Sequence, residues 1–106
     1  MEQNNNTQKD IIVRIDPDLK EIVPDFIRNR HNDILKINEA LKSSDYETIR
    51  ILGHSMKGSG GGYGFDAISD IGAIIEIAAK NKTPKDIIHQ LNTLSSYLRR
   101  VKIVYE

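Results

Sequence analysis

The sequence predicts an all-α protein, an antiparallel four-helix bundle with a short additional N-terminal helix. Apolar residues recur at steps of three and four along most of the chain, which is the spacing of helices that are buried on one face. Capping residues, prolines and glycines interrupt this pattern at short connections, and such connections are typical of antiparallel bundles. The chain of 106 residues suits a single domain.

The composition excludes several classes of function. The 15 basic and 15 acidic residues cancel, so the overall charge does not favour nucleic acid or an anionic membrane as a partner, and we expect neither. The chain has no cysteine, which excludes disulfides, thiolate nucleophiles and thiolate metal sites. No stretch is as apolar as a signal peptide or a membrane span requires. We therefore expect a cytoplasmic protein.

The beginning of the chain carries no helical pattern. Residues 1–10 are polar and rich in asparagine and glutamine, and we expect them to form a flexible arm. Residues 11–15 have the β-branched composition of a strand, but we find no second strand candidate to pair with them. We therefore expect an extended lead-in that packs on the bundle. The predicted division is residues 1–15, the polar arm and lead-in, and residues 16–106, the helical bundle domain.

Two helices are expected in the next part of the chain. Asp16 followed by Pro17 is typical of an N-cap with proline at the first helical position, so a short helix begins there. Pro24 would break or kink this helix, and a longer helix follows to about Lys42. The apolar side chains of the longer helix define its buried face, and the pattern places Arg30 among the polar residues.

The second long helix is unusually rich in glycine. Ser44 and Glu47 have the spacing of a capping box, which predicts where this helix begins. Each interior glycine disfavours a helix by about 1 kcal/mol relative to alanine, so the glycine density implies that another surface comes close. Gly53 and Gly60 lie on the apolar stripe and would let a neighbouring helix pack tightly. Gly64 is expected to close the helix in the left-handed conformation.

The last two helices complete the predicted bundle. Residues 65–80 carry an amphipathic pattern, and Thr83 with Pro84 predicts the N-cap and first position of the final helix. The apolar seam of that helix continues over residues 87–105. The sequence therefore predicts four main helices with short links.

His54, in the second long helix, is the candidate catalytic residue. At 100° per residue its side chain points about 140° away from the apolar stripe, so we expect the imidazole to face solvent. A free imidazole titrates at about pH 6.5, so an exposed histidine is largely neutral in the cytoplasm and can act as a nucleophile. Lys57 lies one turn further on the same side, where it could pair with phosphoryl oxygens.

This stretch resembles the histidine-containing phosphotransfer domain, or HPt domain, of multistep two-component phosphorelays. That family shows a histidine, then Lys-Gly-Ser after two residues, and a glycine ten residues after the histidine. The matching residues here are His54, Lys57, Gly58, Ser59 and Gly64. The family then shows small and hydrophobic positions around a serine and a glutamate, matched here by Ile68, Ser69, Gly72, Ile75, Glu76, Ala79 and Lys80.

The resemblance implies that His54 accepts a phosphoryl group from the aspartyl phosphate of one receiver domain and passes it to the aspartate of another. Lys57 would help to hold the phosphoryl group, and Gly58 would clear the approach. Mg²⁺ would belong to the receiver, so the chain is expected to need no cofactor or metal and to have no kinase activity of its own. The implied partners are response-regulator receiver domains and hybrid histidine kinases, and the chain is expected to be a monomer.

The helix that follows the histidine helix supplies further candidates. Antiparallel packing places residues 73–80 beside His54, so Glu76 and Lys80 could orient the ring or contact the phosphoryl group. The glycines on the histidine side of the helix would let the surface of a partner protein reach the imidazole. The expected docking residues are Arg50, Gly58, Gly61, Glu76 and Lys80.

The same residues are compatible with a second class of function. The alternative from another class is a helical adaptor that is not phosphorylated and binds a receiver domain through the same face. A phosphate-binding loop is not indicated, because Lys57 precedes Gly58 instead of following a glycine. The relaxed dinucleotide pattern at Gly62 follows a helix, whereas that fingerprint requires a preceding strand. His31 and His89 lack neighbours at metal-ligand spacing, and we expect both to be solvated or lightly packed.

Overall fold

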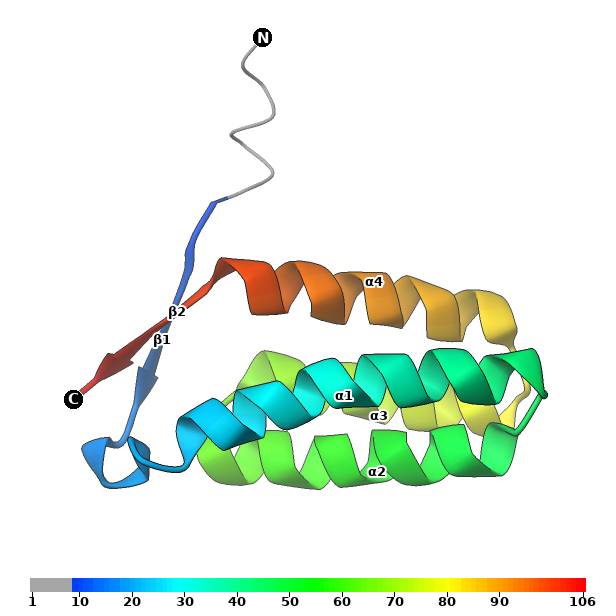
Figure 1. The fold of residues 1–106 in the computed structure, drawn as a ribbon, viewed down its shortest axis with the longest axis horizontal. Helices are drawn as coiled ribbons and strands as arrows, with labels where there is room; N and C mark the ends of the chain where they lie inside the picture. Colours follow the sequence, from blue (N-terminus) through cyan, green and yellow to red (C-terminus); the bar gives the residue numbers. More distant parts are fainter. Residues whose placement is uncertain (1–8) are drawn as a thin grey trace, which may run out of the picture.

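The computed structural model describes residues 9–106 and shows four long helices side by side, with two short strands at one end (Figure 1). Residues 1–8, most of the expected polar arm, lie outside the described part of the chain. Within residues 9–106, no helix is both long and apolar enough to cross a membrane. The elements are β1 (Ile11–Ile15), η2 (Pro17–Leu19), α1 (Val23–Lys42), α2 (Tyr46–Tyr63), α3 (Asp66–Lys80), α4 (Pro84–Arg100) and β2 (Val101–Tyr105).

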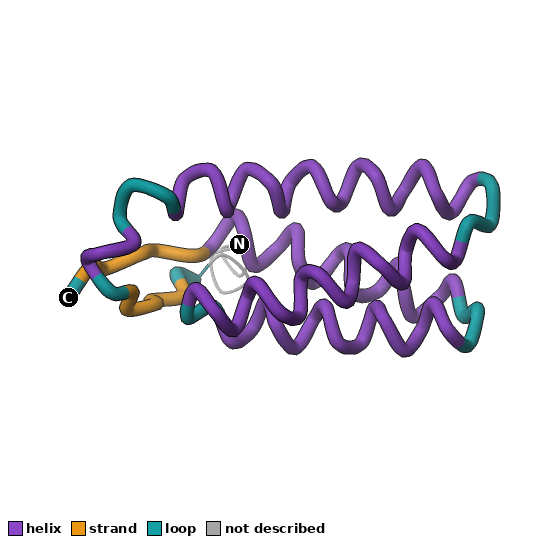
Figure 2. Tube along the Cα trace, turned by 90° about the horizontal axis from the view of Figure 1, so that it is seen from below, coloured by secondary structure: helices purple, strands orange, loops and turns teal. Residues whose placement is uncertain are grey.

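The predicted set of four helices is confirmed. Consecutive helices run in opposite directions and are joined by short turns, as Figures 1 and 2 show. α1 begins at Val23 and has Pro24 in its first turn, where the missing N–H removes no helical hydrogen bond. α1 ends at Lys42, as expected. The prolines and caps therefore mark where the helices begin and end.

Two short strands contradict the all-α prediction. β1 and β2 pair in parallel, with Ile11 opposite Val101 and Ile15 opposite Tyr105. The lead-in at residues 11–15 therefore has a strand partner, and the last helix ends at Arg100 instead of following the apolar pattern to residue 105. Both errors have one cause. The two strands come from opposite ends of the chain, so local periodicity cannot show that they pair.

The predicted short N-terminal helix is only a single turn. Residues 17–19 form the 3-10 turn η2, not an α-helix. The predicted cap is present, because Asp16 accepts a hydrogen bond from the backbone N–H of Asp18 at 2.9 Å. None of the residues of η2 is buried. Leu19 is the one residue of the turn that packs, partly buried, against the core, so η2 adds only one apolar side chain to the packing of the bundle.

The N-cap of α2 is Asp45, where the sequence predicted Ser44. The Asp45 carboxylate accepts hydrogen bonds from the hydroxyl of Thr48 at 2.6 Å and from its backbone N–H at 3.2 Å, and these bonds lower the pKa of Asp45. Ser44 has a φ of 54° and belongs to the turn before the helix. At the other end, Gly64 has a φ of 92°, which confirms the predicted left-handed C-cap.

The core fills the space between the helices and reaches the strand end, where Ile15 is buried. The ring of Phe26 stacks on those of Tyr63 and Phe65, at centroid distances of 4.4 and 5.2 Å. This stack joins α1 to the C-terminal end of α2. The side chains with no exposed surface include Ile37, Ile49, Met56, Ile68, Ile75, Ile87 and Leu94.

Arg30 is buried with Asp33, which corrects the prediction that Arg30 lies on the polar face of α1. Nε of Arg30 is 2.9 Å from Oδ2 of Asp33 without hydrogen-bond alignment, and Nη1 donates to the hydroxyl of Ser59 at 3.0 Å. Burial raises the pKa of Asp33, and the charge of Arg30 offsets only part of this rise. The buried face of α1 follows alternating steps of four and three through Phe26, Arg30, Asp33, Ile37 and Ala40.

Three glycines let α2 and α3 approach so closely that a side chain would not fit between them. The backbone of the opposite helix occupies the space that a Cβ would need at each of these positions. The predicted close-packing role of Gly53 and Gly60 is thereby confirmed. The nearest atoms to a Cβ would be the backbone nitrogens of Glu76 at 2.8 Å for Gly53, of Ser69 at 2.6 Å for Gly60, and of Lys57 at 2.5 Å for Gly72.

We predict that Gly72→Ala lowers the free energy of unfolding by about 1–3 kcal/mol, because its Cβ would force α2 and α3 apart. Gly58→Ala is the matched control, since no atom lies within 4 Å of its Cβ position. It should raise the free energy of unfolding by up to about 1 kcal/mol through helix propensity. Urea unfolding followed by circular dichroism measures both. Equal effects of the two substitutions would contradict the close packing.

Candidate functional site

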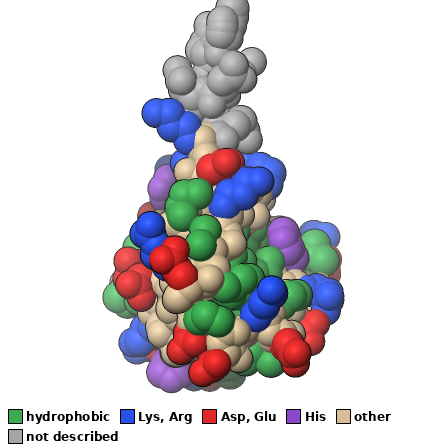
Figure 3. Space-filling view, turned by 90° about the vertical axis from the view of Figure 1, so that its left-hand side faces the viewer, with side chains coloured by type: hydrophobic (Ala, Val, Ile, Leu, Met, Phe, Trp, Pro, Cys, Tyr) green, Lys and Arg blue, Asp and Glu red, His purple; other side chains and the backbone are tan. Residues whose placement is uncertain are grey.

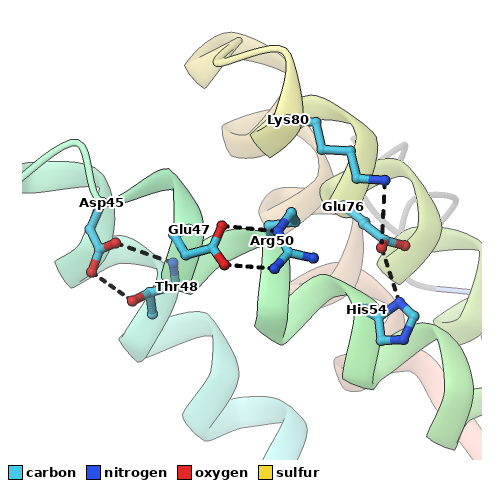
Figure 4. Close-up of polar contacts among 7 residues, drawn as sticks. All are labelled: Asp45, Glu47, Thr48, Arg50, His54, Glu76 and Lys80. Carbon is cyan, nitrogen blue, oxygen red and sulfur yellow. Dashed lines mark hydrogen bonds and ion pairs between the residues drawn. The ribbon is translucent and has the colours of Figure 1, made fainter.

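His54 lies near the middle of α2, on the side away from the core. Its side chain is 66% exposed, as the sequence predicts, whereas Met56 on the apolar stripe is fully buried. α3 packs beside this part of α2, and side chains from the two helices meet around the imidazole (Figure 4). The ring is therefore open to solvent on one side and contacts α3 on the other.

Glu76 of α3 contacts the imidazole. Nδ1 of His54 lies 3.0 Å from Oε2 of Glu76, and the two side chains point toward each other in Figure 4. The Glu76 side chain is only 9% exposed. Its backbone nitrogen lies where a side chain on Gly53 would be, so the tight packing of the two helices sets its position. The carboxylate is therefore held by the fold and is not a mobile surface group.

Two lysines also lie near this carboxylate. Nζ of Lys57 is 3.6 Å from Oε1 of Glu76, and Nζ of Lys80 is 4.0 Å from Oε2. Burial raises the pKa of Glu76, but the hydrogen bond with His54 and the charges of His54, Lys57 and Lys80 outweigh burial, so the pKa falls below its ordinary value of 4.5. Glu76 is therefore ionised at neutral pH and can only accept hydrogen bonds.

The ionised carboxylate determines which ring nitrogen of His54 is free. Because Glu76 has no proton to donate, the proton shared in their hydrogen bond belongs to Nδ1. In the neutral ring the lone pair then resides on Nε2, on the far side of the ring from the carboxylate. The site thus presents an oriented, exposed nitrogen nucleophile.

Lys57 and Gly58 adjoin the imidazole on α2. The hydroxyl of Ser69 donates to the backbone carbonyl of Lys57 at 2.7 Å, which holds this turn of α2 against α3. Gly58 is exposed, and no atom lies within 4 Å of its Cβ position. On the side of His54 that faces the C-terminal end of α2, no side chain of Gly58 therefore blocks the approach to the ring, as the sequence predicts.

Arg50 and Gly61 lie at the two ends of this face. Arg50 precedes His54 by one turn, and its guanidinium binds Glu47 through two hydrogen bonds of 3.0 and 2.6 Å (Figure 4). Gly61 is exposed and lies seven residues after His54, or about 10 Å along the helix, and its Cβ would touch only Ser69 at 3.7 Å. Of the expected site residues, Glu76 contacts the ring, and Lys57 and Lys80 lie beside the carboxylate of Glu76.

Arg30 also lies near the site, although the sequence pattern places it on the polar face of α1. It reaches from α1 to the hydroxyl of Ser59 and so ties the glycine-rich part of α2 to the first helix. The spacing of four residues after Phe26, an apolar residue of the buried face, was the available signal. That signal is weak, because arginine is seldom buried unless it is paired.

Neither the described residues nor the comparisons with other proteins indicate a metal site or a family for this chain. Among residues 9–106, no group of three or more His, Asp or Glu side chains is arranged to hold a metal ion. His31 on α1 and His89 on α4 are exposed. None of the family models, curated proteins or solved structures compared with the chain matches it.

We predict that Glu76→Gln reduces the acid sensitivity of the fold. The folded-state pKa of Glu76 lies below 4.5, so the ionised group stabilises the protein above about pH 4.5, and this stabilisation is lost as the pH falls through the lowered pKa. Between about pH 5 and pH 3, the wild type should therefore lose more free energy of unfolding than the variant. Urea unfolding across this range measures both, and parallel curves would contradict the prediction.

Proposed function

We propose that this chain is a phosphorelay intermediate of the HPt type, which accepts a phosphoryl group on His54 from one receiver domain and passes it to another. The observation that carries the proposal is the contact of Nδ1 of His54 with the buried carboxylate of Glu76, which leaves Nε2 free and exposed. The antiparallel helices and the open surface at Gly58 also support it.

The proposed reaction begins with the lone pair of Nε2. It attacks the phosphorus of the receiver's aspartyl phosphate, the N–P bond forms, and the P–O bond to the aspartate breaks and releases a carboxylate. The ring gains positive charge in this step, and Glu76 stabilises it through Nδ1–H. Transfer onward is the reverse step, with the aspartate of a second receiver as the nucleophile.

The lysines would accommodate the charge of the phosphoryl group. Nζ of Lys57 is already near the ring, because it lies 3.6 Å from the carboxylate that contacts His54. Lys80 lies on the other helix, one turn after Glu76. Both side chains are about half exposed, so they can turn from the carboxylate to phosphoryl oxygens. Mg²⁺ would be bound by the receiver domain.

The test is phosphotransfer from receiver domains of the source organism that carry a labelled aspartyl phosphate. We predict an acid-labile, base-stable label on the wild type and none on His54→Gln, because glutamine has no nucleophilic nitrogen. Lys57→Ala should keep the label and slow its formation by about tenfold to a hundredfold. Absence of label on the wild type with every receiver would overturn the proposal. Receiver binding without transfer would support the alternative helical adaptor.

We predict that Gly58→Leu keeps the fold and slows transfer by about tenfold to a hundredfold, because its side chain would stand beside His54 and misplace the receiver. Asn92→Leu, at an exposed position on α4, is the control for an added apolar side chain and should leave the rate unchanged. Thermal unfolding checks that both variants fold. Equal rates for Gly58→Leu and the wild type would show that the receiver does not approach over this glycine.

A further inference from the structure

β1 and β2 form a parallel sheet of only two strands. Parallel strands usually lie inside larger covered sheets, and an isolated two-stranded sheet is marginally stable in water. β1 and β2 pair with each other at the end of the bundle, where Figure 2 shows them extending beyond the helices. Within residues 9–106, each strand therefore has one edge without a strand neighbour, and such an edge is a template for another strand.

The register identifies the backbone groups on the outer edge of β2. The N–H of Glu106 donates to the carbonyl of Ile15 at 3.1 Å, and Ile15 is paired with Tyr105. Alternate residues of each strand face the partner in a parallel ladder, so the even-numbered residues of β2 face β1. The N–H and C=O groups of Val101, Ile103 and Tyr105 therefore face the outer edge.

Most of these outward groups have no backbone hydrogen-bond partner among residues 9–106. The N–H of Val101 donates to the carbonyl of Tyr97 at the end of α4. No other backbone hydrogen bond between described residues involves the outward groups of the three residues. The outer edge of β1 is shorter, because only Ile12 and Arg14 face outward there. β2 is therefore the edge with more hydrogen-bonding capacity.

We propose that the outer edge of β2 pairs with the same edge of a second copy of this chain, antiparallel and with Ile103 opposite Ile103. This register places Val101 opposite Tyr105 of the other copy, so all five residues of each β2 are paired. The two Ile103 residues exchange N–H to C=O bonds, and each Tyr105 N–H donates to a Val101 carbonyl. The product is a symmetric four-stranded sheet in the order β1, β2, β2, β1.

The side chains of β2 fit this pairing with itself. Val101 opposite Tyr105 is a β-branched and aromatic pair, which stabilises antiparallel sheets. Lys102 lies opposite Val104, so no like charges oppose each other on the exposed side. Figure 3, which views the strand end of the molecule, shows hydrophobic side chains exposed between charged ones. A paired edge would cover part of this apolar surface.

The charges that flank β2 favour a second copy over an unrelated strand. Arg100 precedes the strand and Glu106 follows it, each three residues from Ile103. The proposed pairing has a two-fold axis between the two Ile103 residues. This axis brings Arg100 of one copy to the same end of the sheet as Glu106 of the other. Glu106 uses Oε2 to bind Arg14 of its own copy at 3.1 Å, and Oε1 has no side-chain partner among the described residues.

This assembly would leave the His54 face open. A Cβ on Gly64, at the end of α2, would lie 3.3 Å from Ile15 of β1, so this end of α2 adjoins the sheet. His54 lies ten residues earlier, about 15 Å along the helix. Each dimer would therefore carry two accessible histidines, whereas the sequence alone predicts a monomer. The pairing rests on the strands and not on the proposed phosphotransfer.

The absence of cysteine from the sequence allows a test by crosslinking. In the proposed register, Lys102 and Val104 of opposite copies are a directly opposed pair about 4.5 Å apart at Cα, within the span of a disulfide. Lys102→Cys and Val104→Cys are purified separately, mixed and oxidised. We expect disulfide dimers that join one variant to the other. Ile12→Cys, exposed on the same face of β1, measures crosslinking by random collision.

Three results would overturn the proposal. Crosslinking of the mixture at only the Ile12→Cys level excludes pairing of the β2 edges. Stronger crosslinking of Lys102→Cys alone or Val104→Cys alone excludes the register centred on Ile103. A wild type that sediments as a monomer at every concentration excludes a second copy as the occupant and leaves the edge to a strand of another protein.

A charge reversal tests the same register without changing the strand. Glu106→Arg places like charges at both ends of the paired strands and should raise the dissociation constant of the dimer by about tenfold. Arg14→Ala removes the ion pair within one copy and should not weaken the dimer. Sedimentation measures both constants, and circular dichroism checks that the variants fold. An unchanged constant for Glu106→Arg would contradict the proposed register.

Discussion

The close packing of α2 against α3 is the constraint on which the candidate site depends. Backbone atoms of α3 occupy the space that a side chain on Gly53 would need. In the same way, backbone atoms of α2 occupy the space that a side chain on Gly72 would need. This contact brings the Glu76 carboxylate to the imidazole of His54. Glycine is costly inside a helix, and at Gly53 and Gly72 this cost is offset because the close approach places the Glu76 carboxylate beside the ring.

The electrostatics of the site follow from that carboxylate. A buried acid would ordinarily be hard to ionise, but His54, Lys57 and Lys80 surround Glu76 and keep its pKa low. The same groups suit both states of the proposed relay. With a free ring, Glu76 holds the proton on Nδ1, and with a phosphoryl group on Nε2, the partly exposed lysines would meet the added negative charge.

The strand pair has a separate structural role, because it joins the two ends of the described chain and closes one end of the core. Ile15 is buried there, and Nζ of Lys20 lies over the ring of Tyr105, 5.7 Å from its centroid. Four helices alone would leave no backbone edge to extend. The strands create one, which makes the end of the bundle a candidate interface distinct from the histidine face.

The sequence by itself determined the helices and the exposure of His54 beside Lys57, because apolar spacing, prolines and caps act within a few residues. The N-cap of α2 shows the limit of such local prediction. The hydroxyl of Ser44 and the carboxylate of Asp45 can both cap a helix, and the structure uses Asp45, one residue after the predicted cap. Only the tertiary structure decided the pairing of β1 with β2, the burial of Arg30, and the contact of Glu76 with Nδ1. These features depend on side chains and strands that are distant in sequence, and no local period encodes which of them will meet.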